Sequence, residues 1–382
     1  MNAFEGSSVQ NAIYLAGAEW PVTAEEWEAA ARATMDPAAF DYIAGGAGGE
    51  ATVRANVEAF ERRRLRPRML AGNLARDLSV ELFGVRHRSP LLLAPVGTIS
   101  IAHAEADIGV ARAAAAARVP FVLSSAASSS LEQVAETMGD APRWFQLYWI
   151  NDRDVAASFV ARAQASGYSA IVVTIDTPNL GWRPRDLRNA YLPFLRGDGC
   201  ANWFTDPVFL ATLDRPPDED PLSAAAAMLA TFPNLGLTWN DLDWLRGLVS
   251  VPLLVKGVVT AEDAALALDH GVDGIVVSNH GGRQVDGAVA ALDALVEVRD
   301  AVGPGVPLLM DGGVRRGADV VKALALGADA VLIGRLYAYG LAVGGAAGVE
   351  AVIRQLLAET DLTLALCGGT AVSSLDRSLV AG

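Results

Sequence analysis

The 382-residue chain contains little cysteine and little positive charge. Its two cysteines, Cys200 and Cys367, cannot form a disulfide framework, and neither belongs to a CxxC or Cys/His pair, so no metal site is expected. There are 30 Lys and Arg against 44 Asp and Glu, a formal net charge of -14. Phosphate backbones and anionic lipids attract clustered Lys and Arg. We therefore expect neither nucleic acid nor a membrane as a partner.

The sequence also lacks a recognisable leader and an uninterrupted apolar span. The N-terminal MNAFEGSSVQNAIYL has no basic segment followed by an apolar core, so no signal peptide is expected. The longest apolar stretch, residues 330–353, is broken by Arg335 and several glycines, which disfavours a membrane span. Hydrophobic residues make up 52% and charged residues 19%, as in a well-packed globular protein. The cytoplasm is the expected compartment.

Eight short runs rich in Val, Ile and Leu predict buried parallel strands. They begin at Leu91, Phe121, Trp144, Ala170, Leu253, Gly274, Pro307 and Ala330. Ala- and Leu-rich helical patterns lie between most of them. This alternation predicts an α/β fold, a (β/α)₈ TIM barrel over residues 86–382, preceded by an N-terminal helical extension over residues 1–85.

One connection in this barrel is unusually long. The fourth and fifth strands begin at 170 and 253, much farther apart than any other consecutive pair. The intervening segment is polar and rich in Pro and Ala. We predict a lid insertion at about residues 184–240, because long excursions from a barrel are often functional or mobile. A merely decorative insertion is the alternative.

Polar side chains stand where the predicted strands end. In a TIM barrel, the C-terminal strand ends carry the chemistry. The residues at these ends are Ser124, Gln146, Tyr148, Thr174, Asp176, Lys256, Ser278, His280, Asp311 and Arg335. Their alignment predicts one site assembled from many strands.

Glycine-rich turns follow the last two strands, in DGGVRRG and IGR. Glycines allow backbone N–H groups to approach a phosphate, and Arg315 and Arg335 add positive charge there. Two such turns at these strands predict a phosphate site.

The segment VSNHGGRQVDG places His280 three residues before Arg283. A lone histidine is most often structural. Here Asp176 ends another strand of the same ring and could orient the imidazole, while Arg283 could hold an anionic substrate. This arrangement is typical of a general base. Lys256 is placed to stabilise negative charge that develops on a bound cofactor, or else forms an ordinary ion pair.

These residues carry a resemblance. SNHGGRQ resembles the signature of the FMN-dependent L-2-hydroxy acid oxidising family, and the segments DYIAGGAGGE, LAPVG, FQLYW, TIDTPNLGWRPRD, LLVKGV and DGGVRRGADVVKALALGADAVLIGR extend the likeness over almost the whole chain. Within the family, GWRPRDL, PFLRG and TDPVF are most similar to segments of lactate 2-monooxygenases.

The resemblance implies FMN as the cofactor, no metal, and a role for each matching residue. His280 would be the base and Asp176 its support. Arg283 and Arg183 would clamp the substrate carboxylate. Tyr42 would help to hold that carboxylate, Tyr148 would bind the substrate oxygen, and Lys256 would face the flavin. The remaining FMN-binding positions would be Pro95, Val96, Gly97, Ser124, Gln146, Thr174, Ser278, Asp311, Gly313, Arg315, Gly334 and Arg335.

The predicted function is therefore oxidation of an L-2-hydroxy acid by O2 through FMN, with lactate 2-monooxygenase as the favoured activity, giving acetate, CO2 and water. The alternatives are an oxidase that releases the 2-oxo acid and peroxide, a dehydrogenase with another electron acceptor, and a non-catalytic flavin-binding barrel. Small residues around Ala126 predict a roomy pocket suited also to longer or aromatic hydroxy acids. The resemblance implies a homotetramer or homo-octamer.

Overall fold

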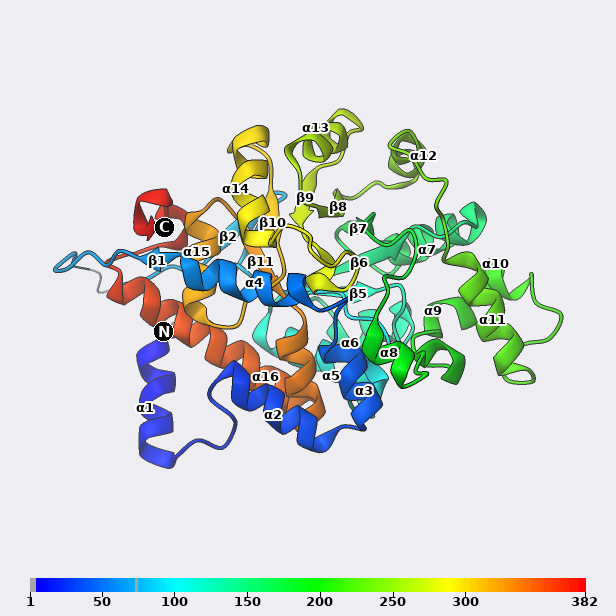
Figure 1. The fold of residues 1–382 in the computed structure, drawn as a ribbon, viewed down its shortest axis with the longest axis horizontal. Helices are drawn as coiled ribbons and strands as arrows, with labels where there is room; N and C mark the ends of the chain where they lie inside the picture. Colours follow the sequence, from blue (N-terminus) through cyan, green and yellow to red (C-terminus); the bar gives the residue numbers. More distant parts are fainter. Residues whose placement is uncertain (1–4, 73–74) are drawn as a thin grey trace.

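A closed barrel of eight parallel strands forms the centre of the computed structural model, which describes residues 5–72 and 75–382 (Figure 1). The strand order around the barrel is β10-β11-β4-β5-β6-β7-β8-β9. The strands are β4 (Leu91–Leu93), β5 (Phe121–Ser124), β6 (Arg143–Tyr148), β7 (Ile171–Thr174), β8 (Leu253–Val258), β9 (Gly274–Val277), β10 (Leu308–Met310) and β11 (Ala330–Ile333). The predicted TIM barrel is confirmed, with each strand close to its predicted start.

Each barrel strand leads to a helix that packs outside the barrel. These helices are α5 (Ala106–Ala117), α6 (Leu131–Met138), α7 (Arg153–Ala165), α12 (Asp241–Leu248), α13 (Ala261–Asp269), α14 (Ala291–Val302), α15 (Gly317–Ala325) and α16 (Arg335–Leu366). Local signals explain several helix starts: Ser130 and Gln133 form a capping box at α6, and Asp152 caps α7. Short 3-10 turns are η1 (Ile99–Ile101), η3 (His280–Gly282), η4 (Val372–Ser374) and η5 (Arg377–Leu379).

Helix α16 is, in the described part of the chain, the one helix long and apolar enough to cross a membrane. Its most apolar window is 67% buried within the protein, against α1, α2, α5 and α15. The backbone leaves the helical region at Gly344 and Gly345, where the helix bends. Its apolar surface is thus covered by the protein's own helices.

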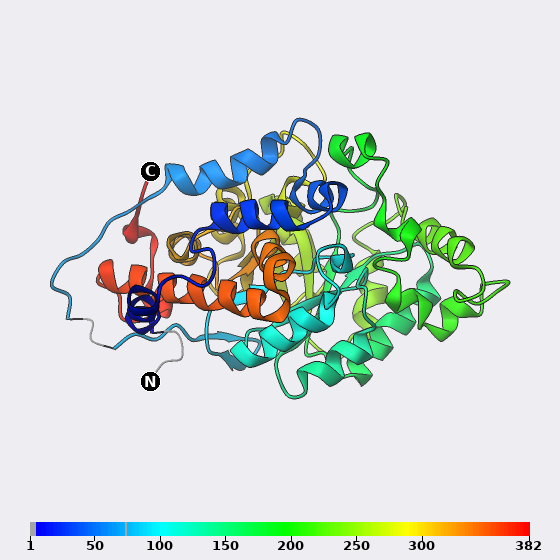
Figure 2. The same cartoon turned by 90° about the horizontal axis from the view of Figure 1, so that it is seen from below.

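The N-terminal part consists of α1 (Gly6–Ala16), α2 (Ala24–Thr34), α3 (Pro37–Ala44) and α4 (Ala51–Arg62). Helices α1 and α2 pack against α16, and the turned view shows α2 running beside α16 (Figure 2). The helical extension predicted for residues 1–85 is helical in the structure only as far as the end of α4, and short strands follow it. Strand β1 (Arg64–Leu65) pairs with β12 (Val380–Ala381), and β2 (Val80–Leu82) pairs with β3 (Val85–His87).

The β2–β3 hairpin closes the N-terminal end of the barrel, and packing against the barrel core explains why these residues form strands rather than a helix. Leu82 belongs to the same buried cluster as the inward-facing strand residues, and Phe83 lies 5.8 Å from Trp144, ring centre to ring centre. The inward-facing residues of this cluster include Leu92, Val122, Val172, Leu254, Val276, Leu309 and Leu332. A hydrophobic plug at this end leaves the opposite, C-terminal end for polar side chains.

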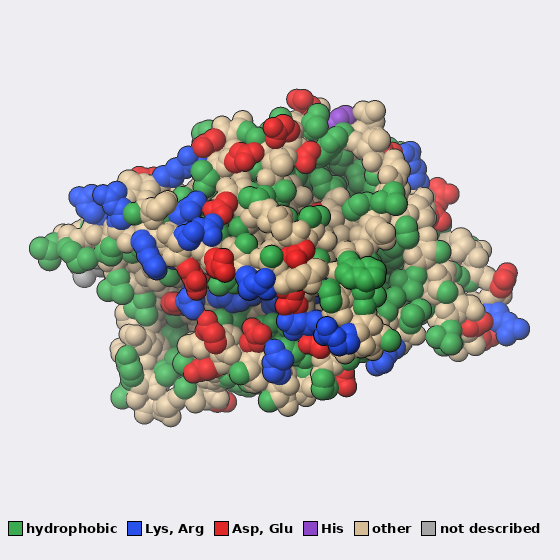
Figure 3. All heavy atoms as spheres, viewed as in Figure 1, with side chains coloured by type: hydrophobic (Ala, Val, Ile, Leu, Met, Phe, Trp, Pro, Cys, Tyr) green, Lys and Arg blue, Asp and Glu red, His purple; other side chains and the backbone are tan. Residues whose placement is uncertain are grey.

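The long connection after β7 forms a helical insertion, seen at the right of Figure 1. Its elements are α8 (Pro184–Arg188), η2 (Pro193–Arg196), α9 (Ala201–Phe204), α10 (Pro207–Leu210) and α11 (Pro221–Thr231). We call residues 184–240 the lid. On the molecular face in Figure 3, positive and negative side chains are mixed rather than separated into a basic patch.

Candidate active site

A cavity opens at the C-terminal ends of the barrel strands. Its empty space, counted out to the open mouth, is about 1420 Å³. The predicted site residues that line it are Tyr42, Pro95, Val96, Gly97, Tyr148, Arg183, Lys256, His280, Arg283, Asp311, Gly313, Arg315, Gly334 and Arg335.

Four other predicted residues are buried behind this lining: Ser124, Gln146, Thr174 and Ser278. They form part of a polar layer at the strand ends. Ser124 Oγ donates to Gln146 Oε1 at 3.0 Å, and Gln146 Nε2 donates to Thr174 Oγ1 at 2.9 Å. The structure therefore gathers the predicted residues at one end of the barrel, and this second layer fixes the orientation of Gln146.

His280 and Asp176 form a hydrogen-bonded pair, with Nδ1 of His280 2.8 Å from Oδ1 of Asp176. Since an ionised carboxylate only accepts, Nδ1 carries the proton and Nε2 remains the basic nitrogen. The His280 backbone has φ of 57°, a left-handed conformation uncommon for a side-chain-bearing residue, and its N–H donates to Ser278 Oγ at 3.0 Å. The local backbone is thus held in an unusual conformation that presents the imidazole.

The electrostatics of this pair favour a neutral, basic imidazole. Burial, together with the nearby cations Lys256 and Arg183, lowers the pKa of His280 below its usual value, and the attraction of Asp176 offsets this only in part. Burial opposes ionisation of Asp176, but the charges and hydrogen bonds of its neighbours outweigh burial and lower the pKa of this carboxyl. His280 is therefore available as a proton acceptor at neutral pH.

Arg183 and Arg283 place two guanidinium groups beside this base. Arg183 is buried, and its side chain donates to the carbonyl of Arg283 and to Oε1 of Gln284, both at 3.1 Å. Arg283 donates to the carbonyls of Tyr42 and Gly45. Within the described ranges, neither arginine forms an ion pair with a carboxylate. Burial and the charge of Arg183 lower the pKa of Arg283 to about 9, so Arg283 remains a cation at neutral pH, and the two guanidinium groups favour an anionic ligand.

Two tyrosines complete this polar side of the cavity. The ring of Tyr148 lies 6.4 Å from that of His280 and nearly parallel to it. Burial raises the pKa of Tyr148 to about 12, so the phenol keeps its proton and can donate a hydrogen bond. The Arg283 guanidinium lies 5.0 Å from the ring centre of Tyr42, a cation–π contact that orients the arginine.

Lys256 is buried at the end of β8. Its Nζ donates to Ser278 Oγ at 2.8 Å and lies 3.1 Å from Oδ2 of Asp311. Burial alone would lower the Lys256 pKa, but the carboxylates of Asp311 and Asp176 outweigh it and raise that pKa. This fixed cation suits the stabilisation of negative charge on a ligand at the cavity floor.

The predicted phosphate turns also line the cavity, through Gly313, Arg315 and Gly334. A Cβ on Gly334 would make only ordinary van der Waals contacts, with side-chain carbons at 3.7 Å or more, so the space beside its backbone is not tightly filled. The sequence predicts that Arg335 adds positive charge at the phosphate site. In the structure its guanidinium donates hydrogen bonds to the backbone carbonyls of Ile43, Gly45 and Gly281. Arg335 thus ties the His280 loop to α3 while lining the cavity, and burial lowers its pKa.

The variant Gly281→Ala tests the contact between Gly281 and Arg335. Gly281 has φ of 60°, and an added Cβ would lie 2.9 Å from Nη1 of Arg335. We expect the variant to lose about 1–3 kcal/mol of folding free energy and to retain FMN less tightly, measured by thermal unfolding and flavin fluorescence. The matched control is Gly287→Ala, with φ of 80° but open space around its Cβ position. Equal losses in both variants would show that backbone strain alone, and not Arg335, explains the effect.

Several residues in or beside the cavity escaped the sequence-based prediction. Thr177 Oγ1 donates to Oδ1 of Asp176 at 2.8 Å and lies 3.2 Å from Nδ1 of His280, and only its position after Asp176 hinted at this. Gln284 follows Arg283 directly and holds Arg183. Phe194 and Phe232 reach the cavity from the lid, and no local pattern marked them.

The comparisons with known proteins agree with this site. The family model described as FMN-dependent dehydrogenase matches residues 31–382. The chain belongs to this family. It is 43% identical to an FMN-dependent alpha-hydroxy acid dehydrogenase of Penicillium citrinum, over 91% of this chain and 87% of that one. It is 42% identical to an L-lactate oxidase of Lysinibacillus sphaericus, over 94% of this chain and 92% of that one.

A solved structure of (S)-mandelate dehydrogenase superposes with a TM-score of 0.85 at 37% identity, covering 94% of this chain and 99% of that one. The protein is therefore an FMN-dependent 2-hydroxy acid oxidoreductase. The cavity fits this cofactor: Lys256 and Asp311 form a polar floor, Ser278 is hydrogen-bonded to both behind it, and glycine-rich turns with Arg315 border the cavity. The individual roles assigned to these residues stay predictions.

Proposed function

We propose that this FMN-dependent dehydrogenase family member oxidises an L-2-hydroxy acid with O2 as the electron acceptor. The observation that carries the proposal is the His280–Asp176 pair beside two guanidinium groups that have no carboxylate partner among the described residues. An anionic substrate with an acidifiable hydroxyl matches both features.

The side chains divide the work of this reaction. Arg283 and Arg183 bind the substrate carboxylate and orient the carbon that bears the hydroxyl. His280 accepts one proton at Nε2, and Asp176 stabilises the resulting imidazolium through Nδ1. Tyr148, protonated at neutral pH, donates to the substrate oxygen. Bound FMN would supply the two-electron acceptor, and Lys256 would place a fixed positive charge beside it.

Two outcomes follow for the oxidised product. Reduction of O2 yields hydrogen peroxide, and an oxidase would release this with the 2-oxo acid. In a monooxygenase the two products react before release, giving the acid shortened by one carbon, CO2 and water. Lactate would then give acetate. The lid supports this second candidate, lactate 2-monooxygenase, because Phe194, Leu229 and Phe232 of the lid line the cavity, and a segment that covers a site slows the release of products.

Product analysis with L-lactate in air tests these candidates. We expect acetate with little free peroxide, and an acetate yield that added catalase does not change, because catalase destroys only released peroxide. Pyruvate with stoichiometric peroxide would identify an oxidase. Flavin reduction without air followed by slow reoxidation in air would indicate another electron acceptor. Absence of flavin reduction by any L-2-hydroxy acid would contradict the proposed function altogether.

The cytoplasmic location and the homotetrameric or homo-octameric assembly stay predictions.

A further inference from the structure

The lid supplies an apolar wall to the active-site cavity. Phe194 from η2, Leu229 from α11, and Phe232 and Pro233 directly after α11 all line it. Phe194 and Phe232 lie 5.7 Å apart, ring centre to ring centre. We call Phe194, Leu229, Phe232 and Pro233 the lid wall.

Ring contacts connect the lid wall to the catalytic base. Phe232 lies 5.6 Å from Tyr148 in an edge-on contact, and Tyr148 lies 6.4 Å from His280. The wall therefore contacts Tyr148, the residue predicted to bind the substrate oxygen, and is separated from the predicted base His280 by that one aromatic ring. A small molecule that contacts Tyr148 and His280 lies close enough to contact the wall as well.

A 2-hydroxy acid presents three different groups to such a site. On the proposed function, its carboxylate binds the two arginines and its hydroxyl-bearing carbon faces His280 and Tyr148. The third group is the side chain, and the lid wall is the apolar surface left for it. Ala126 also lines the cavity and, with its single methyl group, leaves this region open.

We propose that the lid wall makes this enzyme selective for L-2-hydroxy acids with a branched aliphatic or aromatic side chain over lactate. This inference rests on the proposed oxidation of a 2-hydroxy acid and names the substrate class. Each methylene group that the wall removes from water contributes about a fourfold gain in binding. A substrate with three additional carbons gains roughly fiftyfold if all of them are covered.

Trp203 of α9 sets the position of Phe232. The Trp203 ring lies 5.3 Å from that of Phe232 and 4.9 Å from that of Phe159 on α7. Trp203 is completely buried, and its indole nitrogen has no hydrogen-bond acceptor in the part of the chain that the structure describes. Packing alone therefore places the ring, so its position depends on how firmly the surrounding α9 backbone is held.

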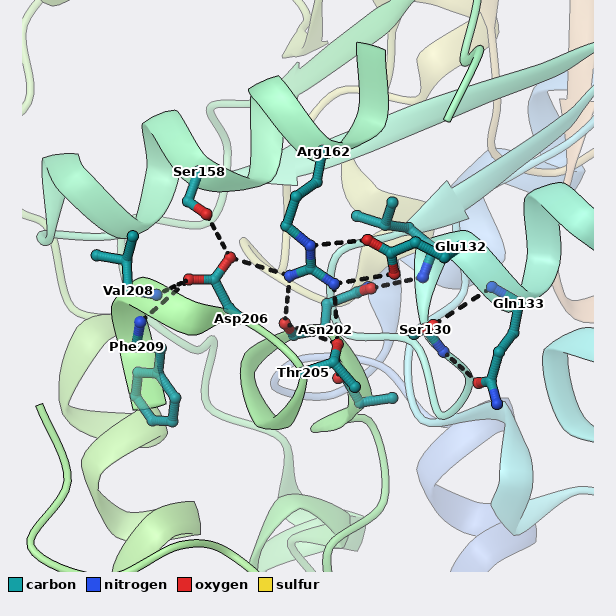
Figure 4. A network of polar contacts seen from close by, with 12 residues as sticks. Ser130, Glu132, Gln133, Ser158, Arg162, Asn202, Thr205, Asp206, Val208 and Phe209 are labelled. Carbon is teal, nitrogen blue, oxygen red and sulfur yellow. Dashed lines mark hydrogen bonds and ion pairs between the residues drawn. The ribbon is translucent and has the colours of Figure 1, made fainter. Parts of the chain in front are cut away.

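A polar network centred on Arg162 holds that backbone (Figure 4). Arg162 lies on α7, and its guanidinium uses all five N–H donors. Two bonds go to the carboxylate oxygens of Glu132, at 2.8 and 3.0 Å. The other three go to the carbonyl of Asn202, Oγ1 of Thr205 and Oδ2 of Asp206, at 2.9, 2.8 and 2.9 Å. The last three acceptors flank Trp203 in the lid.

Asp206 extends this network into the lid. Asp206 is fully buried, and its Oδ2 also accepts a hydrogen bond from Oγ of Ser158 on α7 at 2.7 Å. Its Oδ1 accepts from the backbone N–H groups of Val208 and Phe209 at the start of α10. Asn202 binds the loop after β5 through the carbonyl of Ser125 and the N–H of Leu131. Arg162 is thus a positioning residue: it acts on the substrate pocket through α9, Trp203 and Phe232.

The first test compares L-lactate, L-2-hydroxy-4-methylpentanoate and L-mandelate as substrates of the FMN-loaded enzyme and of Phe232→Ala. We expect the wild type to prefer the two larger acids by tenfold or more in kcat/KM. In Phe232→Ala, kcat/KM for the larger acids should fall by about ten- to a hundredfold, with lactate changed less than threefold. Dissociation constants of benzoylformate and pyruvate, read from the flavin absorbance without turnover, should shift in the same pattern.

The outcomes separate this inference from the proposed function. If no 2-hydroxy acid reduces the flavin, the proposed function fails. If all three acids are oxidised but lactate is preferred, or if Phe232→Ala affects all three equally, the function stands and the lid-wall inference is overturned.

The second test asks whether Arg162 acts through the wall. Arg162→Gln should lower the preference for the larger acids by about three- to tenfold, mainly through KM, with little effect on the rate of flavin reduction by lactate. Arg162→Lys should restore part of this preference. Glu132→Gln, at a partly exposed partner, is a milder variant should Arg162→Gln fold poorly. The matched control is Arg153→Gln on the same helix, whose exposed ion pair with Asp241 lies outside the network. Selectivity that is unchanged in Glu132→Gln and in folded Arg162→Gln would refute the positioning role.

Discussion

Replacing His280 by glutamine is expected to lower kcat/KM for any 2-hydroxy acid substrate by about 10²–10⁴-fold. Glutamine preserves a hydrogen bond toward Asp176 but cannot accept the substrate proton. The variant should still retain FMN, since the predicted phosphate and ring contacts lie on other residues. Turnover and flavin absorbance of the purified protein measure the two properties separately.

The pH dependence of the wild-type enzyme provides a second test of the prediction that His280 is the base. Because burial lowers the pKa of His280 below its usual value of 6.5, the base stays unprotonated as the pH falls to 6.5. We expect kcat/KM to decrease only below that pH, where the imidazole gains a proton, and the His280→Gln variant should lack this acid limb. The control is His270→Gln, a histidine paired with Asp243 on the surface. Substantial turnover by His280→Gln would contradict the assignment of the base.

Replacing Arg283 by glutamine is expected to raise KM by about 30- to 5,000-fold, since loss of one partner of a buried charge pair costs roughly 2–5 kcal/mol. Arg283→Lys should recover only part of this loss, because an ammonium group cannot bind a carboxylate through two parallel hydrogen bonds. Arg183 would remain to hold the substrate, so some activity should persist. Initial rates over a range of substrate concentrations separate KM from kcat.

A nearby arginine provides the control for this experiment. Arg185 lies two residues after Arg183, but its guanidinium binds Glu50 and Asp41. Arg185→Gln should leave KM within about threefold of the wild type, since exposed or partly exposed ion pairs contribute little. The affinity for pyruvate, measured by flavin absorbance, should fall in Arg283→Gln and not in Arg185→Gln. An unchanged KM in Arg283→Gln would exclude a role in binding the carboxylate.

Local sequence patterns were sufficient to predict the barrel and most of the polar site. Buried parallel strands require continuous apolar runs, and such runs placed all eight strands, from Leu91 to Ile333. Since parallel strands of a barrel end at one face, the residues that follow them had to meet there. That reasoning anticipated the contact of His280 with Asp176, although the two are far apart in the chain.

The sequence prediction was less accurate where packing overrides local pattern. Residues 80–87 form a hairpin rather than part of a helical extension, because Leu82 and Phe83 complete the barrel core. Ser124, Gln146, Thr174 and Ser278 lie behind the cavity lining, since hydrogen bonds to neighbouring strand ends bury them. A sequence cannot distinguish a strand-end residue in the lining from one in the layer beneath it.

By itself, the sequence determined the barrel and the polar residues at its strand ends, because both depend on residue type and on periodicities of a few residues. The class of protein followed from the resemblance of its motifs to a known family. Only the tertiary structure shows that the lid lines the cavity. Phe194 and Phe232 reach the cavity because Trp203 and the Arg162 network hold an irregular segment against α7. These contacts join residues from four separate parts of the chain and follow no local period, so they exist only once the chain has folded.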